Sequence, residues 1–227
     1  MNQTTSPPSS EINPGSERIL DAAESLFAEH GFNGVSIQQV ANKSGISKAT
    51  VFHHFANKQE LYISVVRRAC EGTMRLLQSL SSDAQGDALK QLGDYRQRDL
   101  SEIQAHASVV RLILRELTMG NESQAKQLVD DVFGEHFLRL KNLITRAQSH
   151  GQIRPDMDAG IQAHAIVSIN IMLFLLWPVL HHLPDTPFSD IEHASRQTFR
   201  MLLEGIQTPA PSEKTIAGSR THSPDLS

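Results

Sequence analysis

Residues 36–55 read SIQQVANKSGISKATVFHHF, and this stretch predicts two short helices joined by a tight turn. Ser36 followed by Gln39 forms a capping box that opens the first helix. Gly45 ends that helix, and Ser47 caps the next one. Two short helices separated by a glycine-containing turn are what a helix-turn-helix motif requires. By itself the stretch fits two interpretations equally, a DNA-reading element and a structural turn between two short helices.

The second helix of this stretch divides into an apolar face and a polar face. The inner face carries three anchors: Ile46, Val51 and Phe55. The outer face carries the residues predicted to contact DNA: Lys48, Ala49, Thr50, Phe52 and His53. Lys48 and His53 suit a base edge or a phosphate, and Thr50 suits a phosphate or a thymine methyl group. Ala49 is small, so the helix backbone has room to approach the duplex closely.

Two contacts with the DNA backbone are predicted beside this helix. Ser36 begins a helix whose free N–H groups suit a phosphate, and Lys58 adds a positive charge in the first turn of the following helix. The net charge of the chain is −4, but segment 32–68 has a single acid, Glu60. Its basic residues are Lys43, Lys48, Lys58, Arg67 and Arg68. A basic face on an acidic protein is compatible with DNA binding, because only the docking surface meets phosphates.

The rest of the chain also has a helical pattern. One apolar stripe consists of Ile19, Ala22, Ala23, Leu26 and Phe27, and Gly31 ends that helix. Asn57 followed by Glu60 begins a long helix. Further helices are predicted near 84–102, 106–119, 122–150, 158–177 and 189–206. No useful stretch alternates with period two, so the prediction is an all-α fold with about nine helices.

Residues 31–66, GFNGVSIQQVANKSGISKATVFHHFANKQELYISVV, resemble the DNA-binding domain of the TetR/AcrR family of bacterial repressors. The similarity extends from Ser16 to about Val66, and it includes the Ala-x3-Gly-Ile-Ser turn and the His-Phe pair at 54–55. One position departs from the family pattern. The family usually has a tyrosine whose hydroxyl reaches a phosphate where this chain has Phe52, so that phosphate contact is lost here.

The resemblance implies an all-α, homodimeric transcriptional repressor with a three-helix reading head and a linking fourth helix. It implies dimerisation through the last two helices, about 158–177 and 189–206. The implied partners are a palindromic double-stranded DNA operator and a small organic effector that releases the protein from it. Enzymatic activity and a cofactor are not expected.

Four segments follow along the chain. Residues 1–13 are polar and predict a flexible arm, and residues 14–74 form the predicted helix-turn-helix domain of the TetR type. Residues 75–207 form the predicted ligand-binding and dimerisation domain. Residues 208–227 contain three prolines and no apolar periodicity, which predicts a disordered tail. The N-terminus lacks the features of a signal peptide, and the single Cys70 suggests a reducing compartment, so a cytoplasmic location is expected.

By the resemblance, candidate effector contacts lie among the helices of the C-terminal domain. They are Arg111, His164, Asn170, Phe174 and Trp177. Without the resemblance, Asn170, Phe174 and Trp177 fit a core. Arg111 and Arg115 lie one turn apart, and such a pair fits a solvated face, an ion pair with Glu116 or Glu122, or an anion anchor.

Residues 160–180 contain no charged side chain and are long enough to cross a bilayer. Polar interruptions favour a buried or dimer-interface helix over a membrane span, and they are Gln162, His164, Ser168 and Asn170. No membrane association is therefore expected. Cys70 lies on the inner half of the long helix, which favours an inert buried thiol over a redox sensor.

The chemistry of a metal site or an enzyme is not evident in the sequence. The 11 histidines show no ligand spacing, and the adjacent pairs at 53–54 and 181–182 point apart on a helix, so no metal is expected. The alternative function is a helical enzyme or carrier that uses an apolar pocket. It needs a nucleophile–base pair or a metal constellation, and neither has a recognisable spacing here.

Overall fold

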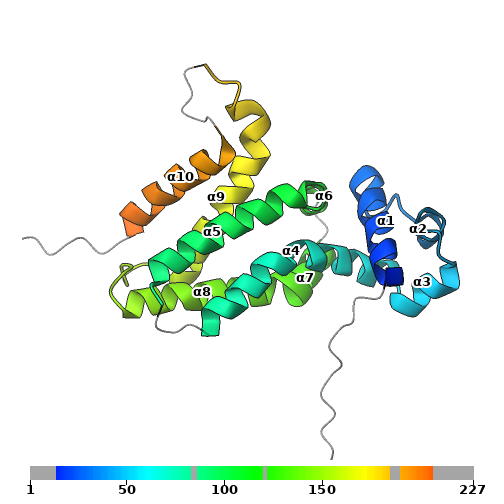
Figure 1. Ribbon diagram of the computed structural model, residues 1–227, viewed down its shortest axis with the longest axis horizontal. Coiled ribbons are helices and arrows are strands. Elements are labelled where there is room, and N and C mark those ends of the chain that lie inside the picture. Colours follow the sequence, from blue (N-terminus) through cyan, green and yellow to red (C-terminus); the bar gives the residue numbers. More distant parts are fainter. Residues whose placement is uncertain (1–13, 83–85, 120–121, 185–189, 207–227) are drawn as a thin grey trace, which may run out of the picture.

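The computed structural model describes residues 14–82, 86–119, 122–184 and 190–206, and every regular element within these ranges is helical (Figure 1). The elements are α1 Pro14–His30, α2 Ile37–Ser44, α3 Lys48–His54, α4 Lys58–Ser82, α5 Ala88–Ala105, α6 Ala107–Thr118, α7 Glu122–Leu128, the π-helical turn η1 Val129–Phe133, α8 Gly134–Ser149, α9 Ala159–Leu180 and α10 Ile191–Ile206. The all-α prediction is confirmed. The predicted arm, 1–13, and the predicted tail, 208–227, lie outside the described residues.

Each of the nine predicted helices has a counterpart. The helix predicted near 122–150 corresponds to α7, η1 and α8, which follow one another without a break. In η1 the N–H of Gly134 donates to the carbonyl of Val129, five residues back. A Cβ at Gly134 would lie 2.7 Å from that carbonyl oxygen, so a glycine is required at this turn.

The prediction that the penultimate helix ends at residue 177 is wrong, because α9 continues through Pro178 to Leu180. A proline inside a helix removes the hydrogen bond of its own nitrogen. Here that loss falls in the last turn, where the next N–H groups still find acceptors. The N–H of His181 donates to the carbonyl of Trp177 at 3.3 Å. The helix therefore ends one turn later than the proline suggests.

Helices α1, α2 and α3 pack with the start of α4 into a small head, on the right in Figure 1. The side chains at the centre of its core are completely buried, and they include Phe27, Val40, Val51 and Leu61. The ring of Tyr62 on α4 meets Phe27 and Phe32 edge-on, with centroids 5.8 and 5.2 Å apart. These contacts fix the orientation of the head on α4.

Helix α4 connects the head to the rest of the molecule (Figure 1). It has 25 residues and is therefore about 37 Å long, at a rise of ~1.5 Å per residue. Its C-terminal half packs against α5 and α8. The predicted domain boundary, between residues 74 and 75, thus lies inside one continuous helix.

Helices α5, α8, α9 and α10 form the body around a second core. Its buried side chains include Leu92, Tyr95, Leu140, Ile144 and Ile166. Helices α9 and α10 pack side by side, on the side of the body away from the head (Figure 1). The body therefore presents its last two helices at a surface remote from α3.

Candidate nucleic-acid interface

The capping box predicted at Ser36 is present at the start of α2. The Ser36 hydroxyl accepts the N–H of Gln39 at 3.3 Å, and the Ser36 N–H donates to the Gln39 side chain at 2.8 Å. Within the described part of the chain, the amides of Ile37 and Gln38 have no acceptor. They lie at the positive end of the helix dipole, which suits a phosphate oxygen.

One face of helix α3 packs on the core of the head, and the opposite face is exposed. Val51 is completely buried and Phe55 is nearly so, and both belong to the core of the head. The five residues of α3 predicted to contact DNA are all exposed: Lys48, Ala49, Thr50, Phe52 and His53. The ring of Phe52 is 44% exposed, although a large apolar side chain gains free energy by burial. The structure therefore places these five side chains on one outer surface.

The polar groups of α3 are only lightly restrained. The hydroxyls of Thr50 and Ser47 lie 2.8 Å apart, and the Ser47 hydroxyl caps the helix by accepting the Thr50 N–H at 3.1 Å. The ammonium of Lys48 lies 5.9 Å from the centroid of the Phe52 ring. At an exposed site such a contact is worth about 0.5–1 kcal/mol. Lys48 is thus free to exchange the ring for a base or a phosphate.

Lys58 is held more firmly than the sequence indicates. Its ammonium donates to the carbonyls of Phe32 and Val35, each at 3.0 Å, and lies 4.4 Å from the centroid of the Phe32 ring. The charge therefore sits beneath the loop that leads into α2. Contact with DNA stays a prediction for Lys58, whereas its hydrogen bonds show that it positions the Ser36 end of α2.

Two of the five basic residues in segment 32–68 face away from α3. Arg68 forms ion pairs with three carboxylates of α1: Glu17 at 3.1 Å, Asp21 at 2.8 Å and Glu24 at 2.8 Å. Arg67 donates to the carbonyl of Asp131 at 3.2 Å. The basic surface beside α3 is therefore smaller than the sequence predicted. The spacing of the three acids along α1 is a signal that could have indicated a buried basic partner.

The head also contacts the body through α6. The Arg115 guanidinium donates to the Phe27 carbonyl at 2.9 Å, and the Glu116 carboxylate accepts the N–H of Phe32 at 3.2 Å. These two residues hold the backbone at the C-terminal end of α1. The sequence suggested Glu116 only as an ion-pair partner of the arginines on the same helix, and Arg115 Nε does lie 3.9 Å from its carboxylate. Nothing local shows that Glu116 also accepts an N–H from a residue 84 positions away.

Asn170, a predicted effector contact, lies in a buried polar network between α5, α9 and α10. Its amide donates to the Arg96 carbonyl at 2.9 Å and to the Asp99 carboxylate at 2.9 Å, and its oxygen accepts the Ser195 hydroxyl at 2.7 Å. Arg96 donates to Ser195 and to Glu192, each at 2.8 Å. Every polar atom of Asn170 is thereby used inside the protein.

The other four predicted effector contacts separate into two places. The guanidinium of Arg111 lies 5.2 Å from the centroid of the Phe174 ring, so these two side chains meet between α6 and α9. Trp177, one turn further along α9, stacks on His181 with ring centroids 5.7 Å apart. His164 is exposed near the other end of α9. Only Arg111, Phe174 and Trp177 therefore lie in one region.

Asp99 makes the buried network sensitive to pH. The pKa of Asp99 is raised from 3.8 to about 6: burial is the main cause, the hydrogen bond from Asn170 lowers the pKa, and the charge of Glu102 raises it. The folded chain thus holds the Asp99 proton more tightly than the unfolded chain. Stability is greatest below the unfolded pKa and falls as the pH rises from about 4 to about 6.

We expect Asp99→Asn to remove this loss, because an amide keeps an acceptor for Asn170 and carries no charge. The free energy of unfolding of the variant, relative to the parent, should rise by about 3 kcal/mol between pH 4 and pH 7. Urea unfolding followed by circular dichroism at a series of pH values measures the difference. Asp94→Asn, at an exposed position of the same helix, is the control. A parallel pH dependence in the parent and in Asp99→Asn would contradict the assignment.

The outer face of α9 is apolar and uncovered in the single chain. Large exposed side chains along it are Ile161, Met172, Leu175, Leu176 and Val179. Among the described residues α9 alone is long and apolar enough to cross a membrane, and only 22% of its most apolar window is buried. A groove of about 290 Å³ runs between α9 and Thr198 of α10, and its other lining residues all belong to α9.

Residues 19–65 match the family model of bacterial regulatory proteins of the tetR family. The chain is 25% identical to the HTH-type transcriptional regulator RutR of Escherichia coli (strain K12) over 185 residues, which cover 81% of this chain and 80% of RutR. It is 27% identical over 166 residues to the HTH-type transcriptional regulator YerO of Bacillus subtilis (strain 168), covering 72% of this chain but 57% of YerO.

The fold is similar to that of the fatty acid degradation regulator FadR from Bacillus halodurans. The TM-score is 0.69 at 19% sequence identity, and the superposition covers 86% of this chain and 98% of that one. At this level of identity the likeness concerns the fold alone.

Proposed function

This chain belongs to the TetR family of DNA-binding transcriptional regulators, and we propose that it is a cytoplasmic, homodimeric repressor released from a palindromic operator by a small organic effector. The exposed polar face of α3 above its buried anchors is the observation that carries this proposal. It supplies the short, outward-facing helix that enters a major groove.

The apolar face of α9 supports the homodimer. A patch of this kind on a chain of 227 residues marks an interaction surface. A second copy covers it symmetrically, because a two-fold axis brings the same patch of both chains together. Dimerisation through α9 and α10 leaves both heads free, so that each α3 can enter one of two successive major grooves about 34–36 Å apart.

Release by an effector follows from the same geometry. A ligand shifts the population of dimers only if it binds one head-to-head spacing more tightly than the other. The region of Arg111, Phe174 and Trp177 suits such a ligand, because α6 carries Arg111 and, one turn further along, holds the end of α1 through Arg115 and Glu116. An effector bound between α6 and α9 therefore touches the helix whose residues hold the C-terminal end of α1 in the head.

Selection of random duplex DNA by the purified protein, at near-physiological salt, tests the proposed function. The expected result is a palindrome with half-sites about one helical turn apart. Before selection, the protein is also refolded from denaturant to remove any bound effector. If both preparations bind DNA weakly, without sequence preference, and lose this binding at higher salt, the result counts against the proposal.

Replacement of Lys48 by alanine should weaken operator binding about 10-fold, because each good contact with a base edge is worth ~1–3 kcal/mol. If Lys48 contacts only a phosphate, the alanine variant binds all DNA sequences more weakly by the same factor. The slope of log affinity against log salt concentration then falls in magnitude by about one. Fluorescence anisotropy at several salt concentrations separates the two contacts. Lys43→Ala is the control, since the ammonium of Lys43 donates to Ser25 of α1. Unchanged binding would remove Lys48 from the interface.

Phe52→Tyr should strengthen operator binding by about 5-fold. The ring is exposed on the outer surface of α3, so an added hydroxyl remains in solvent in the free protein and reaches a phosphate in the complex. A net hydrogen bond to a charged group is worth about 1.5 kcal/mol or more, less the cost of ordering the ring. An anisotropy titration with the selected operator measures the gain. An equal or weaker affinity would show that this position does not face a phosphate.

A further inference from the structure

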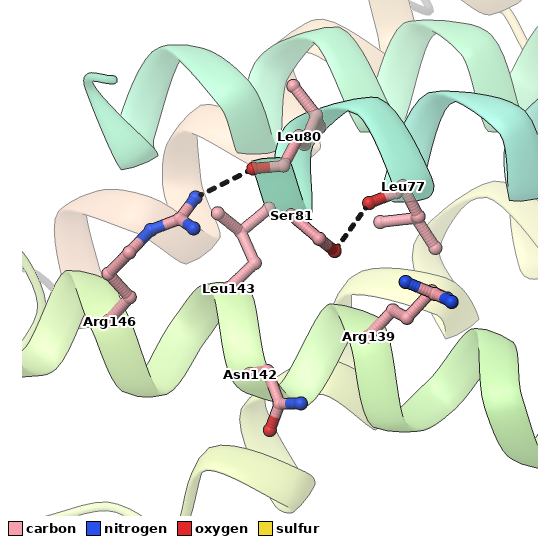
Figure 2. Close-up of a pocket in the computed structure, with 7 residues that line it drawn as sticks. All are labelled: Leu77, Leu80, Ser81, Arg139, Asn142, Leu143 and Arg146. Carbon is pink, nitrogen blue, oxygen red and sulfur yellow. Dashed lines mark hydrogen bonds between the residues drawn. The ribbon is translucent and has the colours of Figure 1, made fainter. Parts of the chain in front are cut away.

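A separate pocket of about 240 Å³ lies between the C-terminal part of α4 and α8 (Figure 2). Its lining residues are Leu77, Leu80, Ser81, Arg139, Asn142, Leu143 and Arg146. It shares no residue with the α3 surface, with the groove along α9 or with the predicted effector contacts.

Both charged side chains that line the pocket are arginines, although the net charge of the chain is −4. Arg139 and Arg146 lie seven residues apart and hence on one side of α8. Figure 2 shows both side chains reaching from α8 toward α4. Arg139 uses Nε and Nη2 to bind one oxygen of Glu135, at 3.0 and 2.6 Å, and within the described ranges its Nη1 has no acceptor.

Arg146 carries a second unused donor. Its Nη2 donates to the carbonyl of Leu80 at 3.3 Å and to the side chain of Gln91, whereas its Nε is buried and has no partner among the described residues. A buried N–H without an acceptor is costly, and nearly all such groups in native proteins find a partner. An anion in the pocket supplies that acceptor.

The rest of the lining is partly apolar: Leu77 and Leu80 come from α4, and Leu143 lies on α8 between the two arginines. Leu77 and Leu143 are 1% and 4% exposed, and Leu80 packs partly buried against the same core. The volume accommodates about eight water-sized groups at ~30 Å³ each. A ligand of about this size that combines an acid group with a short hydrocarbon chain matches both parts of the lining.

We propose that this pocket binds a small amphipathic carboxylate, with its head group at Arg139 and Arg146 and its chain against Leu77, Leu80 and Leu143. Arginine is suited to this role because its planar fork binds carboxylates with two parallel hydrogen bonds. A regulatory role for this site rests on the proposed function, because a ligand bound here contacts the end of α4 that lies opposite the DNA-binding head. Binding itself does not require DNA.

Isothermal titration calorimetry of the full chain, without DNA, tests the site with hexanoate, which has eight non-hydrogen atoms. The expected result is saturable binding of hexanoate, with hexanol, hexylamine and acetate each binding at least 10-fold more weakly. Arg139→Gln should weaken hexanoate binding at least 5-fold, and it should fold normally because this side chain pairs only with the exposed Glu135. Arg146→Gln should abolish binding, with its fold checked by circular dichroism.

The matched control is Lys126→Gln, which removes an exposed cation from an i,i+4 ion pair on α7 and should leave hexanoate binding unchanged. Equal binding of hexanol and hexanoate, or equal binding of hexanoate by Arg139→Gln and the parent, would overturn the proposal. Operator binding of the same preparation without hexanoate is measured separately. A failure to bind the operator counts against the repressor function and does not change the conclusion from hexanoate binding.

Discussion

Replacement of Leu176 by glutamate should convert the protein into a monomer and lower its affinity for the operator at least about 100-fold. Leu176 is 42% exposed and lines the apolar groove along α9. In a two-fold dimer through α9, the substitution places two carboxylates in an apolar interface, where an unpaired charge is strongly unfavourable. In the dimer, binding of one head holds the second head near its half-site, which raises the apparent affinity about 10²–10⁴-fold. A monomer lacks this gain.

Analytical ultracentrifugation and an operator titration measure the two effects together. The parent should sediment at twice the chain mass of 25.2 kDa, and the variant at the chain mass. Leu138→Glu is the matched control, because Leu138 is 57% exposed on α8, outside α9 and α10. A variant that remains dimeric would exclude this face of α9 from the interface. A monomeric variant with full operator affinity would show that dimerisation is not needed for DNA binding.

Replacement of Asn170 by alanine should lower the free energy of unfolding by about 3–5 kcal/mol, the range seen when one partner of a buried charged network is removed. Asn170 is completely buried and joins three helices through Arg96, Asp99 and Ser195. The alanine variant removes a hydrogen-bond donor from a buried carboxylate and the acceptor from the Ser195 hydroxyl. It also leaves a cavity where the amide was.

Urea unfolding at a single protomer concentration measures this loss, because the stability of a dimer depends on concentration. The control is Asn142→Ala, at an exposed position of α8, which should change stability by less than about 0.5 kcal/mol. A loss of less than 1 kcal/mol for Asn170→Ala would show that water replaces the amide. Asn170 would then regain its place as a candidate effector contact.

Local features of the head were predictable because their causes lie within a few residues. At both Ser36 and Ser47 the serine hydroxyl accepts the backbone N–H three residues later, and at Ser36 the Gln39 side chain completes the capping box. Gly45 was predictable as a helix end, since its φ of 65° lies in the left-handed region that favours glycine. The outward face of α3 followed from the helical period, which turns Val51 inward and Lys48 outward.

Roles that depend on distant partners were not predictable in this way. Lys58 looked like a free charge, but its ammonium meets two carbonyls more than 20 residues earlier in the chain. Arg68 looked like part of a DNA-binding face, but it neutralises three acids of α1. Asn170 fitted either a core or, by the family resemblance, an effector contact, and only its hydrogen bonds to Asp99 and Ser195 on two other helices show that it lies in the core.

The sequence by itself determined the all-α class, the reading element and the family, because capping, turn chemistry and helical periodicity are short-range signals. The tertiary structure decided which charged groups bind partners inside the protein, which apolar face stays uncovered in the single chain, and where a pocket opens between α4 and α8. These depend on which helices meet and in what rotation about their axes. A helix presents residues three and four apart on one face, but only packing decides whether that face meets a core, a second chain, a ligand or DNA.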